Sequence, residues 1–290
     1  MALTPEIRAQ LLTFQRLEIT EHHIYKRLAE IVKPEENRRV LEKISQDELF
    51  HYQNWKKYTA QDVQPDSFAI WRYSLISRLF GFTFGIKLME RGEQKAQVNY
   101  EMLRPAIPEI DAWIKDENAH EQSLIAMLDE ELLQYAGSVV LGLSDALVEL
   151  TGALAGLTLA FQNTNLIALS GLITGIAAAL SMASSEYLST QSEKTTRQPS
   201  RAALYTGIAY VFTVALLILP YLLIQNYYID LAMALVTAVL IIAAFNYYIS
   251  VAKDEPFRQR FIQMTGLCLG VAAASFIIGY LVRRLLGIEI

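Results

Sequence analysis

Two Glu-x-x-His pairs are the residues of this sequence best suited to binding a metal ion. They are Glu48 with His51 and Glu117 with His120, and they use two of the four histidines of the chain. Residues three apart lie on one face of a helix, so each pair can present a carboxylate and an imidazole to a shared ion. The pattern therefore predicts a metal site, and a purely structural bundle with these side chains on solvated faces is the alternative.

A second pattern precedes each of these pairs, a glutamate followed seven residues later by a tyrosine. It occurs at Glu18 with Tyr25 and at Glu93 with Tyr100. The order Glu…Tyr and then Glu-x-x-His is thus found twice. This repeat favours Glu93 as a ligand over Glu90, which lies three residues earlier on the same helix face and is an auxiliary candidate.

Four helices are expected to position these residues. Apolar periodicity and the placing of prolines predict them at about 5–33, 35–60, 82–103 and 108–135. Short connections between such helices favour an antiparallel four-helix bundle.

Residues 5–135 resemble the rubrerythrin (erythrin) branch of the ferritin-like di-iron carboxylate proteins. In these bundles two helices give one Glu each, and the other two give a Glu-x-x-His each. The resemblance implies two iron ions, with manganese as the alternative, bound by Glu18, Glu48, His51, Glu93, Glu117 and His120. Carboxylate bridges with one imidazole per metal suit iron or manganese better than zinc.

Three further residues lie near the predicted ligands: Glu21, His22 and Glu121. We interpret them as residues that surround the site or lie on the surface, and an extra metal site is the alternative.

The segment 66–80 is unusually apolar for a connection. It places Phe68, Trp71 and Leu79 around Arg72 and Arg78. It is too short to span a bilayer but suits an amphipathic helix at the membrane surface. Packing against the bundle explains the same pattern equally well.

Two long apolar runs beyond the bundle carry acidic residues. One holds Asp145 and Glu149, and the other holds Met182 and Glu186. Each run is long enough to cross a bilayer, where a carboxylate is costly and marks a pathway or site. If the runs are antiparallel, Asp145 and Met182 lie at one level, with Glu149 deeper and Glu186 nearer the cytoplasm. A thioether beside carboxylates suits Fe²⁺ and disfavours Mg²⁺ or Ca²⁺.

The chain as a whole divides into a charged half and an apolar half. Of its 290 residues, 53% are hydrophobic and 19% charged, which is too apolar for a soluble domain of this size. We expect an all-α protein with a soluble domain at 1–136 and a membrane domain at 137–290. Its spans are predicted at about 137–161, 165–189, 202–225, 229–250 and 262–283.

Charge predicts orientation and partners. Six Lys or Arg residues lie in the linkers after the second and fourth spans, which puts these linkers and the N-terminal domain in the cytoplasm. A prokaryotic inner membrane is the simplest location. The net charge of −5 and the lack of a basic stripe argue against nucleic acid as a partner.

Residues 137–287 resemble the vacuolar iron transporter family through the segments GLSDALVEL and ALSMASSEYLS. The resemblance implies a five-span homodimer that exchanges cytosolic Fe²⁺ or Mn²⁺ for H⁺, with Asp145 and Met182 as transport residues. Glu186 corresponds to the Glu of a Gly-Glu-Tyr segment.

This sequence departs from that family at several places. Ala146 follows Asp145 where the family has Gly, and Glu149 replaces a small polar residue. The Glu-rich helices between the second and third spans are replaced by the short linker SEKTTRQPSR. The N-terminal bundle would then take over metal capture.

The sequence therefore predicts an iron exporter, by proton antiport, with a bundle that binds, oxidises, delivers or senses iron. The alternative is a membrane-anchored rubrerythrin-like ferroxidase or peroxidase without transport. A manganese exporter is a second alternative, since carboxylate–His sites take both metals. Cys268 stands alone, so the Cys-x-x-Cys module that would supply electrons to a peroxidase is missing.

Overall fold

The computed structural model describes residues 5–97, 107, 110–126, 135–193, 197–253 and 255–286, and its elements there are all helices. The chain forms two compact units, Met1–Glu130 and Glu131–Ile290. The predicted all-α class is confirmed, as are five helices in the second unit that are long and apolar enough to cross a membrane.

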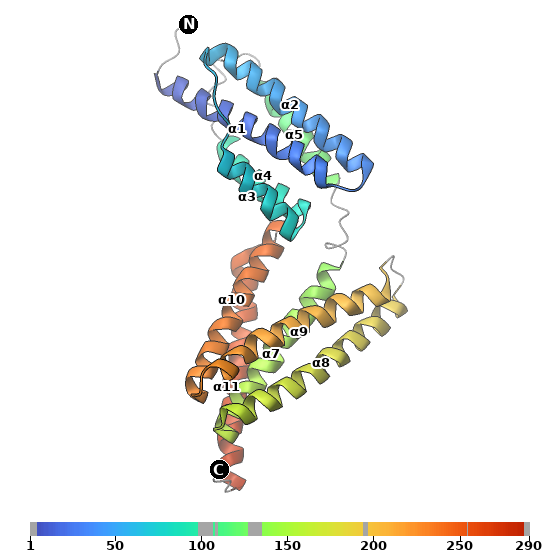
Figure 1. Ribbon diagram of the computed structural model, residues 1–290, viewed down its shortest axis with the longest axis vertical. Coiled ribbons are helices and arrows are strands. Elements are labelled where there is room, and N and C mark those ends of the chain that lie inside the picture. Colours follow the sequence, from blue (N-terminus) through green and yellow to red (C-terminus); the bar gives the residue numbers. More distant parts are fainter. Residues whose placement is uncertain are drawn as a thin grey trace. The chain divides into compact units, whose positions relative to one another are not determined.

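The first unit is built on a pair of long helices, α1 (Pro5–Ile31) and α2 (Glu35–Thr59), which lie side by side (Figure 1). Three shorter helices follow: α3 (Ser67–Phe80), α4 (Phe82–Gln97) and α5 (Ile110–Ala126). Helix α3 packs on α1 and α4, and α5 contacts α2 and α4. The predicted extensions of the last two helices, at 98–103 and 127–134, lie outside the described residues.

Local sequence explains where these helices begin and end. Helix α2 has acidic Glu35 and Glu36 in its first turn and basic Lys56 and Lys57 in its last turn. These charges interact favourably with the helix dipole at both ends. The Asp66 carboxylate caps α3 by accepting hydrogen bonds from two backbone N–H groups of its first turn. Gly81, at a φ of 93°, separates α3 from α4 with a backbone conformation that suits glycine.

Two apolar layers form the core of the first unit. One contains Leu11, Phe14, Trp55, Ile107, Ile110 and Trp113. The other contains Ile24, Tyr25, Leu28, Ala29, Leu41, Ile44, Ile70, Ile86, Met89 and Leu124. On α1, α2 and α5 the stretch between the two layers carries the predicted metal ligands. The polar site is therefore enclosed above and below by hydrophobic packing.

The second unit is organised around α7 (Ala136–Phe161), which contacts each of the other four helices. These are α8 (Thr164–Ser192), α9 (Pro199–Leu223), α10 (Tyr227–Lys253) and α11 (Phe257–Leu286). Helices α8 and α9 lie side by side (Figure 1). Half of the apolar window of α7 is buried, against 17% in α11, so α7 is the most buried of the five apolar helices.

Glycines allow α11 to lie close against α7. A Cβ added at Gly279 would lie 2.4 Å from the backbone oxygen of Gly156, and one at Gly152 would lie 2.9 Å from Val271. Small residues of this kind permit close packing of membrane helices. The Gly152-x-x-x-Gly156 pattern therefore serves packing within the chain.

Candidate functional site

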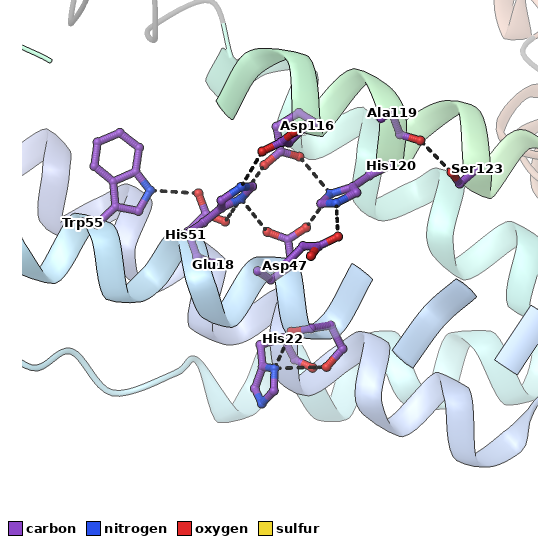
Figure 2. A network of polar contacts seen from close by, with 12 residues as sticks. Glu18, His22, Asp47, His51, Trp55, Asp116, Ala119, His120 and Ser123 are labelled. Atoms are coloured by element: carbon purple, nitrogen blue, oxygen red, sulfur yellow. Dashed lines mark hydrogen bonds and ion pairs between the residues drawn. The ribbon is translucent and has the colours of Figure 1, made fainter. Parts of the chain in front are cut away.

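Four of the six predicted ligands meet in the middle of the first unit. Ligand atoms of Glu18, Glu48, His51 and Glu117 all lie within 4.8 Å of one another, and they come from α1, α2 and α5. His120 adjoins them, with its Nδ1 3.1 Å from Glu48 Oε1 (Figure 2). We refer to these five residues as the carboxylate–histidine cluster.

The cluster is almost closed to solvent. Glu18, Glu48 and His51 are each at most 3% exposed. Within the described residues, Glu48 Oε2, His51 Nδ1 and His120 Nδ1 are buried and make no hydrogen bond of good geometry, although His120 Nδ1 lies in close contact with Glu48 Oε1. His51 Nδ1 lies 3.4 to 3.7 Å from three carboxylates, which is longer than a good hydrogen bond.

Buried polar atoms that lack partners cost stability unless something compensates them. Inward-facing carboxylate oxygens and imidazole nitrogens form the donor set that iron or manganese takes in proteins. The residues present therefore fit a metal ion, and the unpartnered atoms are the observation that supports this fit.

Electrostatic effects inside the cluster point the same way. Burial raises the pKa of Glu48 well above its usual range, and the charge of Glu117 adds to this rise. Burial also raises the pKa of Glu117. For His51 the effect of burial is to lower the pKa, but contacts with Glu117, Glu18 and Glu48 outweigh it and the pKa is raised. The carboxylates repel one another, and a bound cation would relieve that repulsion.

Glu18 is the exception among the carboxylates. Burial acts to raise its pKa, but contacts with His51, Glu48 and Trp55 outweigh this effect and lower it. Trp55 Nε1 donates a hydrogen bond of 3.0 Å to Glu18 Oε1 (Figure 2). Glu18 is thus the carboxylate that the surrounding protein holds most firmly in its charged form.

Two aspartates that the sequence reasoning missed contact the outer nitrogens of the two histidines. Asp47 Oδ2 lies 3.1 Å from His120 Nε2, and Asp116 Oδ2 lies 3.7 Å from His51 Nε2 (Figure 2). Each aspartate directly precedes the glutamate of one Glu-x-x-His pair and reaches the histidine of the other pair. The repeated Asp-Glu-x-x-His pattern was the available signal. A carboxylate at the outer nitrogen orients the ring so that Nδ1 faces the cluster.

The structure describes the side chains of only some of the other residues that were predicted at or near the cluster. Glu90 and Glu93 belong to α4, but their side chains lie outside those that the structure describes, as does that of Glu121. His22 Nδ1 lies 2.6 Å from the backbone oxygen of Ser45, and Figure 2 shows it apart from the cluster. His22 therefore links α1 to α2.

Two of the acids predicted to line the transport pathway, Glu149 and Glu186, are hydrogen-bonded to hydroxyl groups. Ser138 Oγ of α7 donates to Glu186 Oε1 of α8 at 2.6 Å, and Glu186 is buried. The hydroxyl of Tyr210 on α9 donates to Glu149 Oε2 on α7 at 2.7 Å. These contacts were not predicted, because they depend on which faces of three apolar helices meet.

Asp145 and Met182 are both partly exposed, and Met182 packs at the edge of the apolar core. That they lie at one level stays a prediction. A further buried acid, Asp230 near the start of α10, accepts a hydrogen bond of 3.0 Å from Thr164 Oγ1 at the start of α8. Its position among apolar residues gave no sign of this partner.

A model of the VIT family matches residues 136–201, which include α7, α8 and the start of α9. Asp145, Glu149, Met182 and Glu186 all lie within this match. No curated protein and no solved structure shows significant similarity to the chain. The family match and the five apolar helices together indicate an integral membrane protein.

Proposed function

We propose that this protein exports a divalent metal ion, Fe²⁺ in the first place, from the cytoplasm and that its first unit binds the same metal. The proposal is supported most by carboxylates within apolar helices of the segment that matches the VIT family. Glu186 is buried there and Glu149 is bonded to a tyrosine. An acid in a membrane helix is expensive and is a functional site by default.

In the second unit, the transport pathway would use Asp145, Glu149, Met182 and Glu186. Carboxylate oxygens attract the cation, and the Met182 thioether favours Fe²⁺ over Mg²⁺ or Ca²⁺. A proton entering from the far side would neutralise a carboxylate and so weaken its hold on the cation. This is the basis of the proposed proton antiport, and Mn²⁺ is the alternative cargo.

The first unit would hold two iron ions through the carboxylate–histidine cluster together with Glu93. Bound iron would supply one-electron redox chemistry, which the protein could use to oxidise or to sense iron. The chain's own part is to supply negative charge, to exclude water with its two apolar layers and to orient the histidines through Asp47 and Asp116.

The proposed setting is a prokaryotic inner membrane, with the first unit in the cytoplasm and two copies of the chain in a homodimer. The basic linkers between α8 and α9 and between α10 and α11 support this orientation.

Fe²⁺ flux into sealed proteoliposomes tests the proposal. We expect Glu186→Gln to reduce the initial flux at least tenfold, because it removes a charge from the pathway. Glu193→Gln is the matched control. Glu193 ends the same helix, is exposed and pairs with Arg197 at 2.8 Å, so its loss should leave the flux unchanged.

The rival function is a membrane-anchored ferroxidase or peroxidase. It predicts O₂ or peroxide consumption on addition of Fe²⁺ and no Fe²⁺ inside the vesicles for either protein. Equal flux through the parent and the Glu186→Gln variant would refute the assigned pathway.

A further inference from the structure

Helix α3 has one face packed on the bundle and another face that is apolar and uncovered. Ile70, Ser74 and Ser77 are buried. On the open side lie Phe68, Trp71, Leu75, Leu79 and Phe80, and three of them are more than half exposed: Phe68 at 64%, Trp71 at 56% and Leu79 at 68%. We call these five residues the α3 apolar face.

The spacing of these residues makes the face continuous. Phe68, Trp71, Leu75 and Leu79 follow one another at intervals of three, four and four residues, which places them along one stripe of the helix. The exposed stripe of a bundle helix is normally polar, and a contiguous apolar patch indicates a surface that binds something.

Cationic side chains accompany the apolar face. Arg72 and Arg78 are exposed, and within the described residues neither forms an ion pair with a carboxylate. The Arg72 guanidinium lies 4.7 Å from the centre of the Tyr73 ring. Exposed Trp and Leu next to unpaired Arg is the composition of helices that lie in the headgroup region of anionic membranes.

We propose that the α3 apolar face inserts into the headgroup region of the bilayer that the second unit spans. The same chain would be anchored in that bilayer by its five helices that are long and apolar enough to cross a membrane. Eight residues, 127–134, join α5 to Tyr135, and a chain of that length reaches at most about 30 Å. The first unit therefore stays within reach of the lipid surface.

A second copy of the chain is the competing occupant of this face. In a two-fold contact each patch meets its own copy, so Arg72 and Arg78 would approach the same charges on the partner. Anionic lipid headgroups complement these charges, and this favours lipid. The proposal does not depend on metal transport, because a surface helix would serve an anchored enzyme equally well.

The tryptophans of the chain provide a direct test. All three lie in the first unit, and the second unit has none. Trp55 and Trp113 are buried beside the carboxylate–histidine cluster, while Trp71 is exposed. Tryptophan emission of the full chain would be compared in nanodiscs of anionic lipid with and without bromine atoms in the upper acyl chain, since bromine quenches only a nearby indole.

We expect brominated lipid to quench the emission of the parent and to have no effect on the Trp71→Phe variant. Leu79→Glu, which keeps Trp71 but charges the face, should reduce the quenching at least twofold. Gln53→Glu adds the same charge at an exposed position of α2 and should leave it unchanged.

Two results would overturn the proposal. One is equal emission of the parent in both lipids, and the other is quenching that persists in Trp71→Phe. If the emission maximum of Trp71 shifts on dilution of the protein while bromine has no effect, the face binds a second copy instead. Helical circular dichroism of each variant checks that it has folded.

Discussion

Single residues decide how the carboxylate–histidine cluster can hold a metal. Both histidines turn Nδ1 towards the carboxylates and Nε2 towards an aspartate. Because Asp47 and Asp116 each serve the histidine of the opposite pair, the two helices α2 and α5 are linked at both ends of the site. The arrangement would orient the rings for a metal ion.

This arrangement predicts the effect of changing either aspartate. Asp47→Asn should weaken Fe²⁺ or Mn²⁺ binding by about 10–100-fold, the usual cost of losing such a supporting contact. Asp116→Asn should act in the same direction but less strongly, because its distance of 3.7 Å is longer. Titration calorimetry of the full chain measures the affinity.

Asp62→Asn is the control for both aspartates, since Asp62 is exposed and pairs with Lys56 away from the cluster. Unchanged affinity in Asp47→Asn would mean that its contact with His120 is incidental.

The buried acids of the cluster lie close enough to repel one another. The pKa of Glu48 is raised by burial and by Glu117, so without metal the first unit loses stability as the pH rises through that pKa. Glu48→Gln removes this loss and should stabilise the metal-free unit at neutral pH by on the order of 1 kcal/mol. The same change should abolish the stabilisation that added metal gives the parent.

Thermal melting followed by tryptophan emission reports on the first unit alone, because all three tryptophans are there. A Glu48→Gln protein that is less stable without metal than the parent would contradict the idea that the cluster is built for a cation.

Among the helices, α1 and α2 lie where the sequence predicted helices, for identifiable reasons. Glu48 and His51 share a face because helical spacing is fixed, and prolines and charged ends mark where α2 begins and ends. The repeated Asp-Glu-x-x-His pattern marks Asp47 and Asp116 as candidates. That each contacts the histidine of the other pair could not be predicted, because it depends on how α2 and α5 are rotated against each other. For the segment 66–80 the sequence left two alternatives, a helix at the membrane surface and packing against the bundle. In the structure one face of α3 packs on the bundle and the other face is exposed.

The membrane helices were predictable in number but not in their contacts. Their apolar residues surround each helix, so periodicity does not reveal which side meets a neighbour. The hydrogen bonds from Ser138 to Glu186 and from Tyr210 to Glu149 depend on how each helix is rotated about its axis. Helix α10 begins at Tyr227, where the Asn226 side chain accepts hydrogen bonds from the first turn.

The hydrogen bond from Ser138 to Glu186 joins α7 to α8. Ser138→Ala removes the hydroxyl that holds Glu186, which should cost about 0.6 kcal/mol of helix association and lower the initial Fe²⁺ flux severalfold. The carboxylate loses its fixed position, and a loosely held ligand binds a cation less well. Flux into proteoliposomes measures this.

Ser184→Ala is its control, because the Ser184 hydroxyl bonds to Leu180 of its own helix and is exposed. If both variants transport like the parent, the bond to Glu186 has no part in the pathway.

At the level of the whole molecule, one chain joins a bundle that holds the candidate metal site to a membrane unit. Tethering raises the effective concentration of bound metal near the membrane, and this matters most when free metal is scarce. A bundle that delivers iron should therefore affect the apparent affinity of transport more than its maximal rate.

Glu48→Gln tests this coupling. We expect the external Fe²⁺ concentration for half-maximal flux to rise at least threefold while the maximal flux stays near that of the parent. A fall in maximal flux at unchanged half-saturation would point to a regulatory bundle, and no change in either quantity would separate the bundle from transport.

In the proposed mechanism, acids of the membrane unit carry metal out of the cytoplasm against protons. Simultaneous recording of Fe²⁺ and H⁺ fluxes in proteoliposomes, for the parent and for Asp145→Ala, tests it most directly. We predict opposed Fe²⁺ and H⁺ fluxes in the parent and neither flux above protein-free vesicles in the variant. An Asp145→Ala protein that moves Fe²⁺ as fast as the parent would show that Asp145 is not part of the transport pathway.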